Sequence, residues 1–182
     1  MMHDASDDAQ GEASNHATTD VAVDTRDSRY LRQAIALAER AKAEGRHPFG
    51  ALVVAADGTI LAEAGNNALP PTGDPTQHAE RLAAASAAQH HSPQTLAGAT
   101  LYTSAEPCAM CAGAIYWCHI GRVVYAMSEQ RLLELTGNHP GNPTLSLPCR
   151  TVFASGQRAV DVIGPVAGLA DEAARAHVGF WA

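Results

Sequence analysis

The segment from Gly98 to Met127 alternates a buried strand pattern, a helix pattern and a second buried strand pattern. GATLYTS and RVVYAM are short runs of β-branched, aromatic and aliphatic residues. CAMCAGAIYWCHI lies between them and follows a proline, a residue common at the first turn of a helix. Two strands joined through a helix lie parallel in one sheet. This alternation predicts an α/β fold with helices packed on a sheet.

The rest of the chain extends the pattern. Residues 27–45 carry apolar side chains at spacings of three and four and end at a glycine, which predicts a helix. FGALVVAA and GTILAEAGN are β-prone runs joined through Asp57-Gly58, a pair typical of hairpins. Further helices are expected from His78 and over 128–137 and 169–182, with 150–155 as the last candidate strand. We expect a three-layer α/β/α sandwich with a mixed five-stranded sheet.

A chain of 182 residues is long enough for one domain with a hydrophobic core. Residues 1–26 are acidic and polar and show no apolar periodicity, which predicts a disordered or loosely attached tail. Residues 27–182 are expected to form the domain.

Charge and cysteine content exclude several classes of protein. The net charge is −7 with only 12 lysines and arginines, so extended nucleic-acid binding is not expected. Four cysteines are too few and too clustered for a disulfide-stabilised secreted domain. The sequence shows neither a signal peptide nor an apolar run of the roughly 20 residues that cross a membrane. We expect a soluble, cytoplasmic protein without membrane partners.

Cys108 and Cys111, three residues apart at the start of a helix, are candidate metal ligands. The positive end of a helix favours thiolates, and zinc binds thiolate and imidazole ligands. His78 stands at the predicted start of the preceding helix, and both helices should begin at the same edge of the sheet. The three side chains can therefore bind one Zn²⁺. A redox pair and a structural zinc site are the alternatives for the cysteines taken alone.

Glu80 follows His78 after one residue. Its carboxylate would miss the metal but face the same cavity, where it can take a proton from water and deliver it to a substrate nitrogen. His-x-Glu followed by Pro-Cys-x-x-Cys is the signature of zinc deaminases of nucleobases. A His-x-Glu triplet alone would be weak evidence for such a site. Only its combination with Pro-Cys-x-x-Cys supports the prediction.

These motifs resemble the cytidine deaminase superfamily. HPFGALVV, GNN, DPTQHAE, LYTSAEPCAMCAGAIYW and RVVYAM occur in the family's order between about residues 47 and 127. PFGA, the DPT before the histidine and GAIYW resemble the branch of guanine deaminases and tRNA adenosine deaminases, and bacterial guanine deaminases most closely.

The resemblance implies roles for the matching residues. His78, Cys108 and Cys111 would bind zinc, and Glu80 would shuttle protons. Asn66 would contact the base, Phe49 and Trp117 would help line the pocket, and the Glu106 turn would lie near the leaving amine. The family usually forms dimers, so a homodimer is expected.

Two departures from the family bear on the substrate. Gln77 precedes the histidine, where a small residue is usual, and places a longer donor and acceptor near the site. Beyond Met127 the guanine deaminase pattern is absent, and that region helps enclose the substrate in the family. For Phe180 and Trp181, at the end of the chain, a packed anchor and closure over an active site are the two interpretations.

The sequence thus predicts a zinc-dependent hydrolytic deaminase of a small base or nucleoside, with guanine as the first candidate. One alternative is a tRNA adenosine deaminase, although the nearly neutral C-terminal segment offers little for a phosphate-rich substrate. A cytosine or nucleoside deaminase is a second alternative. A non-catalytic zinc-binding domain is a third, which the presence of Glu80 and Asn66 disfavours.

Overall fold

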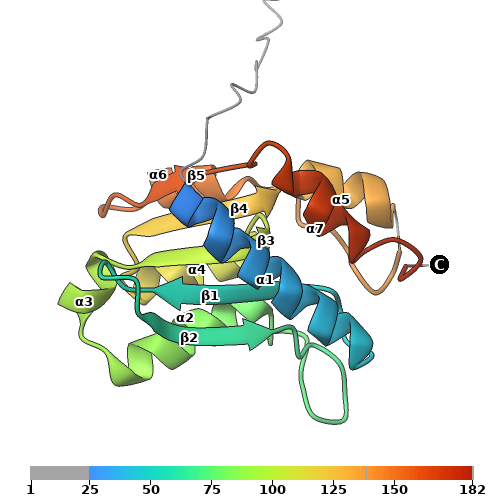
Figure 1. Cartoon of the computed structure of the whole chain (residues 1–182), viewed down its shortest axis with the longest axis horizontal. Helices are drawn as coiled ribbons and strands as arrows, with labels where there is room; N and C mark the ends of the chain where they lie inside the picture. Colours follow the sequence, from blue (N-terminus) through green and yellow to red (C-terminus); the bar gives the residue numbers. More distant parts are fainter. Residues whose placement is uncertain (1–24, 138, 182) are drawn as a thin grey trace, which may run out of the picture.

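The computed structural model describes residues 25–137 and 139–181. They form one five-stranded sheet with helices packed against it. Figure 1 shows the strands, in the order β2-β1-β3-β4-β5, at the centre of the molecule. Their bounds are β1 Gly50–Val54, β2 Ile60–Gly65, β3 Thr100–Ala105, β4 Arg122–Met127 and β5 Asp161–Ile163.

The sheet is mixed, as predicted. β1 pairs antiparallel with both β2 and β3, whereas β3, β4 and β5 pair in parallel. β2 and β3 both oppose β1 and so run in the same direction. The carboxyl ends of β2, β3, β4 and β5 therefore lie along one edge of the sheet, at which β1 begins.

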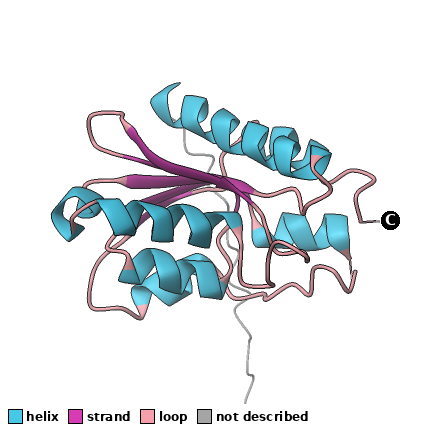
Figure 2. Ribbon diagram, turned by 90° about the horizontal axis from the view of Figure 1, so that it is seen from below, coloured by secondary structure: helices cyan, strands magenta, loops and turns pink. Residues whose placement is uncertain are grey.

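Helices cover both faces of the sheet (Figure 2), which confirms the three-layer arrangement. Side chains of α1 Thr25–Ala43, α5 Glu129–Thr136 and α7 Leu169–Arg175 pack in the core on one face. Side chains of α2 Ala79–His90, α3 Pro93–Ala97, α4 Ala109–Trp117 and α6 Cys149–Ala154 pack in the core on the other. No helix within these described ranges is long and apolar enough to cross a membrane.

Strand residues alternate between the two cores. Leu52 and Val54 belong to the core with α1, and Ala51 and Val53 to the core with α2. The approach of α1 is close: a Cβ on Gly50 would lie 2.3 Å from the Ala34 carbonyl oxygen. Only glycine fits at this start of β1.

The predicted strand at 150–155 is wrong, because this segment is the helix α6. Cys149 and Phe153, four residues apart, are both buried in the core with α2 and α4. Helical spacing thus buries the apolar residues that β-propensity assigned to a strand. The fifth strand is β5 instead, and the short helix α3 was not predicted.

The two ends of the domain also differ from expectation. α1 begins at Thr25, two residues before Asp27, and the remainder of the predicted tail lies outside the described residues. The C-terminal helix α7 ends at Arg175, six residues before Trp181.

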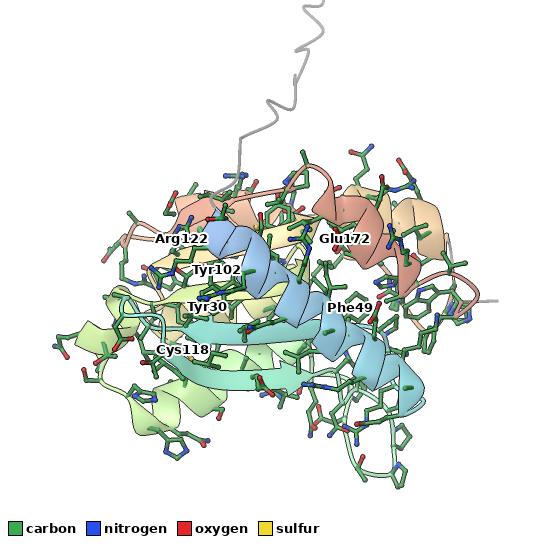
Figure 3. The ribbon with its side chains drawn as sticks, viewed as in Figure 1. Tyr30, Phe49, Tyr102, Cys118, Arg122 and Glu172 are labelled. Atoms are coloured by element: carbon green, nitrogen blue, oxygen red, sulfur yellow. The ribbon has the colours of Figure 1, made fainter. Side chains whose placement is uncertain are left out.

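A buried ion pair fastens the start of α1 to the sheet. The Asp27 carboxylate accepts hydrogen bonds from the Tyr102 hydroxyl at 2.7 Å and from two Arg122 nitrogens at 2.9 and 2.6 Å. Figure 3 shows Tyr102 and Arg122 beside the first turns of α1. Burial alone would raise the pKa of Asp27, but the hydrogen bonds from Arg122 and Tyr102 outweigh it and lower that pKa.

We expect Asp27→Asn to lower the free energy of unfolding by about 2 kcal/mol, because the partly buried Arg122 loses the nearer of its two carboxylate partners. Since the folded-state pKa of Asp27 is lowered, its stabilisation is present above the unfolded-state pKa of about 3.9 and disappears as the pH falls through the folded value. Urea denaturation at pH 7 and in the acid range measures both effects.

Arg40→Ala is the matched control, since the Arg40–Glu63 ion pair is exposed and its loss should change stability by less than about 1 kcal/mol. Equal losses from the two substitutions would contradict the role given to Asp27.

Candidate metal centre and active-site cavity

The three predicted metal ligands meet at the amino-terminal ends of two neighbouring helices. His78 is the N-cap residue of α2, and Cys108 is the N-cap residue of α4, with Cys111 in the first turn. α2 follows β2 and α4 follows β3, so both helices begin at the edge where these parallel strands end. Burial of the alanine-rich faces of α2 and α4 then packs the two helices side by side.

The distances between the donor atoms fit a tetrahedral zinc ion. Nδ1 of His78 lies 3.7 Å from Sγ of Cys108 and 3.6 Å from Sγ of Cys111. Zinc bonds of about 2.0 Å to nitrogen and 2.3 Å to sulfur at a tetrahedral angle separate the nitrogen from the sulfur by about 3.5 Å. All three donors lie within 4.8 Å of one another. Three protein ligands leave the fourth position open, as in catalytic zinc sites.

The two thiols differ in acidity before any metal binds. A hydrogen bond from Cys111, aided by one from His78, lowers the pKa of Cys108 to about 4. The same hydrogen bond, together with burial, raises the pKa of Cys111. The pair thus presents one thiolate, and the second thiol would release its proton on binding the metal.

Glu80 is buried beside this cluster. One carboxylate oxygen, Oε2, lies 3.7 Å from Sγ of Cys111, and the other, Oε1, lies 3.2 Å from Oγ1 of Thr103. Burial raises the pKa of Glu80, although the charge of His78 opposes the shift. Thr103 also reaches the Ala105 carbonyl at 3.0 Å, and its one hydroxyl proton cannot serve both acceptors. Thr103 can therefore donate to the Glu80 carboxylate or accept from its protonated form, so both states of Glu80 have a partner.

A cavity of about 380 Å³ lies next to the three candidate metal ligands. Its wall includes His78, Cys108 and Glu80, and three other residues predicted for substrate binding: Asn66, Phe49 and Glu106. The structure therefore brings the predicted metal, catalytic and most of the predicted substrate residues to one place.

Asn66 and Glu106 are buried polar residues held by backbone groups. Oδ1 of Asn66 accepts a hydrogen bond from the Ala68 amide at 2.8 Å, which leaves the side-chain NH₂ group as the donor available to a ligand. Both carboxylate oxygens of Glu106 accept amide hydrogen bonds, from Cys149 at 3.0 Å and Glu129 at 3.2 Å. The Glu106 side chain thus connects β3 to the starts of α5 and α6.

Gln77 and Trp117 lie outside the cavity wall. Gln77 directs both side-chain polar atoms into its own loop, toward Asn67 and Asp74. Trp117 is 77% exposed on the last turn of α4, where it packs edge-on against Tyr116. Within a single chain, neither side chain is placed for the substrate contact that the sequence suggested.

Glu129 and His47, which no sequence pattern indicated as site residues, both line the cavity. Burial and the nearby Cys108, Glu80 and Glu106 raise the pKa of Glu129 to about 7. One signal could have identified this residue: Glu129 comes two positions after β4, at the same edge as Asn66 after β2 and Glu106 after β3.

Trp181 packs behind the cavity wall of its own chain. Its indole nitrogen donates a hydrogen bond to Nδ1 of His177 at 3.1 Å, and its ring contacts His47, Phe49 and His139. The side chain is buried, with 8% exposed. This packing fits the anchor interpretation of the C-terminal aromatic residues.

We expect His78→Ala and Cys108→Ala proteins to contain little zinc, because two protein ligands hold the ion far less tightly than three. Glu80→Gln should retain about one zinc per chain, since its carboxylate is not needed to hold the metal. Elemental analysis of the purified proteins measures the ratio. Cys118→Ser is the matched control, because Cys118 lies outside the donor cluster. Full zinc content in Cys108→Ala would contradict the site.

Sequence comparison identifies relatives with this kind of centre. Residues 24–127 match the family described as the cytidine and deoxycytidylate deaminase zinc-binding region. The "Probable cytosine deaminase" of Schizosaccharomyces pombe is 39% identical over 86% of the chain and 93% of its own length. The guanine deaminase of Bacillus subtilis is 45% identical over 58% of the chain and 67% of its own length.

Structural comparison gives the same fold. The guanine deaminase of Nitrosomonas europaea superposes with a TM-score of 0.62 at 26% identity, over 85% of this chain and 82% of that one. The family match spans more than half of the chain, and it includes His78, Cys108 and Cys111, the cluster that could hold a metal ion. The protein belongs to the cytidine and deoxycytidylate deaminase family of zinc-dependent enzymes.

Proposed function

We propose that the protein hydrolytically deaminates a free nucleobase, with cytosine and guanine as the two candidate substrates. The proposal rests on one observation: the three candidate zinc ligands, the Glu80 carboxylate and the Asn66 amide lie at one small cavity. Bound zinc would supply a Lewis acid that lowers the pKa of water. The remaining steps fall to the side chains of the chain itself.

Glu80 is placed to hold and move the proton. Its carboxylate lies beside the zinc cluster, and its raised pKa suits a group that first accepts a proton and then donates it. Glu80 would pass the proton it takes from water to the ring nitrogen next to the amino-bearing carbon, as the water oxygen bonds to that carbon. It would then take the proton of the resulting hydroxyl group and give it to the amino group, which leaves as ammonia when the C–N bond breaks. The Asn66 NH₂ group would orient the base by donating to its carbonyl oxygen.

The polar lining of the cavity favours a free base over a nucleotide. It includes the Glu129 carboxylate and, among the described residues, no lysine or arginine. A phosphate would therefore find no cationic side chain in this wall to compensate its charge. A carboxylate can accept a hydrogen bond from the ring N–H that a free base carries and its nucleoside lacks. The same lining argues against a tRNA adenosine substrate.

Different parts of the chain support the two candidate bases. The motifs that resemble guanine deaminases lie between residues 47 and 127, which build the shared deamination machinery. The S. pombe relative matches over 93% of its own length, a span that must include much of the C-terminal third. Because α5 and the loop after it contribute to the cavity wall, this wider match makes cytosine the first substrate to test.

The test is ammonia release from cytosine, guanine, cytidine, guanosine and adenine by zinc-loaded protein. Free bases should be turned over faster than nucleosides, and Glu80→Gln should lower kcat by about 10²-fold or more. Glu129→Gln should lower kcat/KM for the free base by roughly 10- to 100-fold through loss of a charged hydrogen bond. Preference for a nucleoside, or unchanged activity in Glu80→Gln, would overturn the proposal.

We also propose that the protein is a homodimer that pairs through α4. Met110, Gly113, Ala114 and Trp117 lie on one side of this helix at spacings of three and four, and none of them is fully buried. A Cβ on Gly113 would meet no atom within 4 Å, and Trp117 is 77% exposed. An uncharged helix face with a large exposed indole is suited to a second copy of itself, since a twofold axis buries the same residues twice.

We expect Trp117→Glu to shift the protein from dimer to monomer in light scattering, because a desolvated carboxylate would lie at the centre of the interface. Val178→Glu is the control, since it changes an exposed apolar residue outside α4. A wild-type monomer at micromolar concentration would contradict the proposal.

A further inference from the structure

The loop from Asn67 to Gln77 joins two functional groups. Asn66 immediately precedes it and His78 immediately follows it. Ala68, Leu69 and Pro75 within the loop line the cavity. The geometry of this loop therefore affects the substrate contact, the metal ligand and part of the wall together.

Gln77 closes the loop by bonding to its other end. Its backbone carbonyl accepts a hydrogen bond from the Asn67 amide at 2.9 Å, and Oε1 accepts one from Nδ2 of Asn67 at 2.5 Å. Nε2 donates to Oδ2 of Asp74 at 2.8 Å, and the Gln77 amide donates to the Asp74 carbonyl at 2.9 Å. One side chain thus connects the first residue of the loop with its second half.

The rest of the loop packs tightly around Asn67. Nδ2 of Asn67 donates to the Thr72 carbonyl at 3.2 Å, and Oδ1 accepts from the Thr72 hydroxyl at 3.2 Å. A Cβ on Gly73 would lie 1.5 Å from the Asn67 carbonyl oxygen, so only glycine permits this approach. A displacement of Asn67 would therefore disturb the whole loop.

The same loop fixes the orientation of the Asn66 amide. Oδ1 of Asn66 accepts from the amide of Ala68, the residue after Asn67, and this bond turns the NH₂ group toward the cavity. At the other end, the His78 amide donates to the Thr76 carbonyl at 2.9 Å, which fixes the backbone of the zinc ligand. Both functional side chains thus depend on backbone positions next to the Asn67–Gln77 pair.

We propose that Gln77 is a positioning residue. By bonding to both Asn67 and Asp74, it holds the Asn66 amide and the His78 imidazole in their functional positions. The substrate half of this inference rests on the function proposed above. The zinc half does not, because the position of His78 affects metal binding whatever the substrate is.

The experiment compares Gln77→Ala, Asn67→Ala and the double variant. Zinc release to a chromogenic chelator should be roughly tenfold faster in each single variant, as expected for loss of a group that orients a ligand. The increase in the double variant should be smaller than the product of the two single increases, because both substitutions remove the same Asn67–Gln77 side-chain bond. KM for the free base should rise several-fold, with a smaller change in kcat. Gln89→Ala, on the exposed side of α2, is the control for zinc release.

An exchange of donor and acceptor provides the rescue. Gln77→Glu alone sets a second carboxylate against Asp74, and zinc release should accelerate. Adding Asp74→Asn restores a hydrogen bond of opposite direction while keeping the acceptors for Asn67 and Thr76, and zinc release should return to near the wild-type rate. This variant also serves if Gln77→Ala fails to fold.

Three results would overturn the inference: additive effects of the Gln77 and Asn67 substitutions, no rescue by the Asp74 exchange, or a raised KM with unchanged zinc release. The last result would instead make Gln77 a direct substrate contact. If no tested base is turned over, the zinc measurements still decide the positioning role, and only the proposed substrate fails.

Discussion

The parallel direction of β2, β3 and β4 is the constraint on which the rest of the structure depends. Because these strands run the same way, their carboxyl ends meet at one edge of the sheet. Asn66 follows β2, Glu106 follows β3 and Glu129 follows β4. The helices after β2 and β3 begin at this edge too, with His78 and Cys108 at their N-caps. The site is thus assembled from four short segments that the sheet brings to one edge.

The negative charge gathered at this edge has to be compensated. Glu106 is satisfied by two backbone amides, and Glu80 by Thr103 together with a raised pKa. The Cys108 and Cys111 thiolates gain from the positive end of α4 and would gain further from a bound cation. Glu129, whose carboxylate has no comparable set of protein donors among the described residues, is the group left for a ligand. Glu80 and Glu106 thus have protein partners within the site, whereas Glu129 is the carboxylate that would bind the substrate.

Sequence reasoning succeeded where a local pattern has one physical solution. Two cysteines after Pro107 and a histidine before a helix can share one ion when the strands that precede them, β2 and β3, run in the same direction, and the structure has this arrangement. It failed where tertiary packing decides. Residues 150–155 have β-propensity, yet Cys149 and Phe153 are buried at helical spacing. Gln77 looked like a substrate contact because it precedes His78, but propensity and spacing cannot show that Asn67 and Asp74 occupy its amide.

The contacts of Glu106 link residues 47–127, which carry the family motifs, to the C-terminal third of the chain. The two parts therefore cannot be treated as independent. Glu106 belongs to the motif that carries the zinc ligands, but its side chain accepts from the amides of Glu129 and Cys149, the first residues of α5 and α6. The metal-binding segment therefore fixes where α5 begins, and with it the place of the Glu129 carboxylate. On the function proposed above, Glu106 would therefore couple the zinc-binding segment to the carboxylate that reads the base, so that neither part of the chain can change independently of the other.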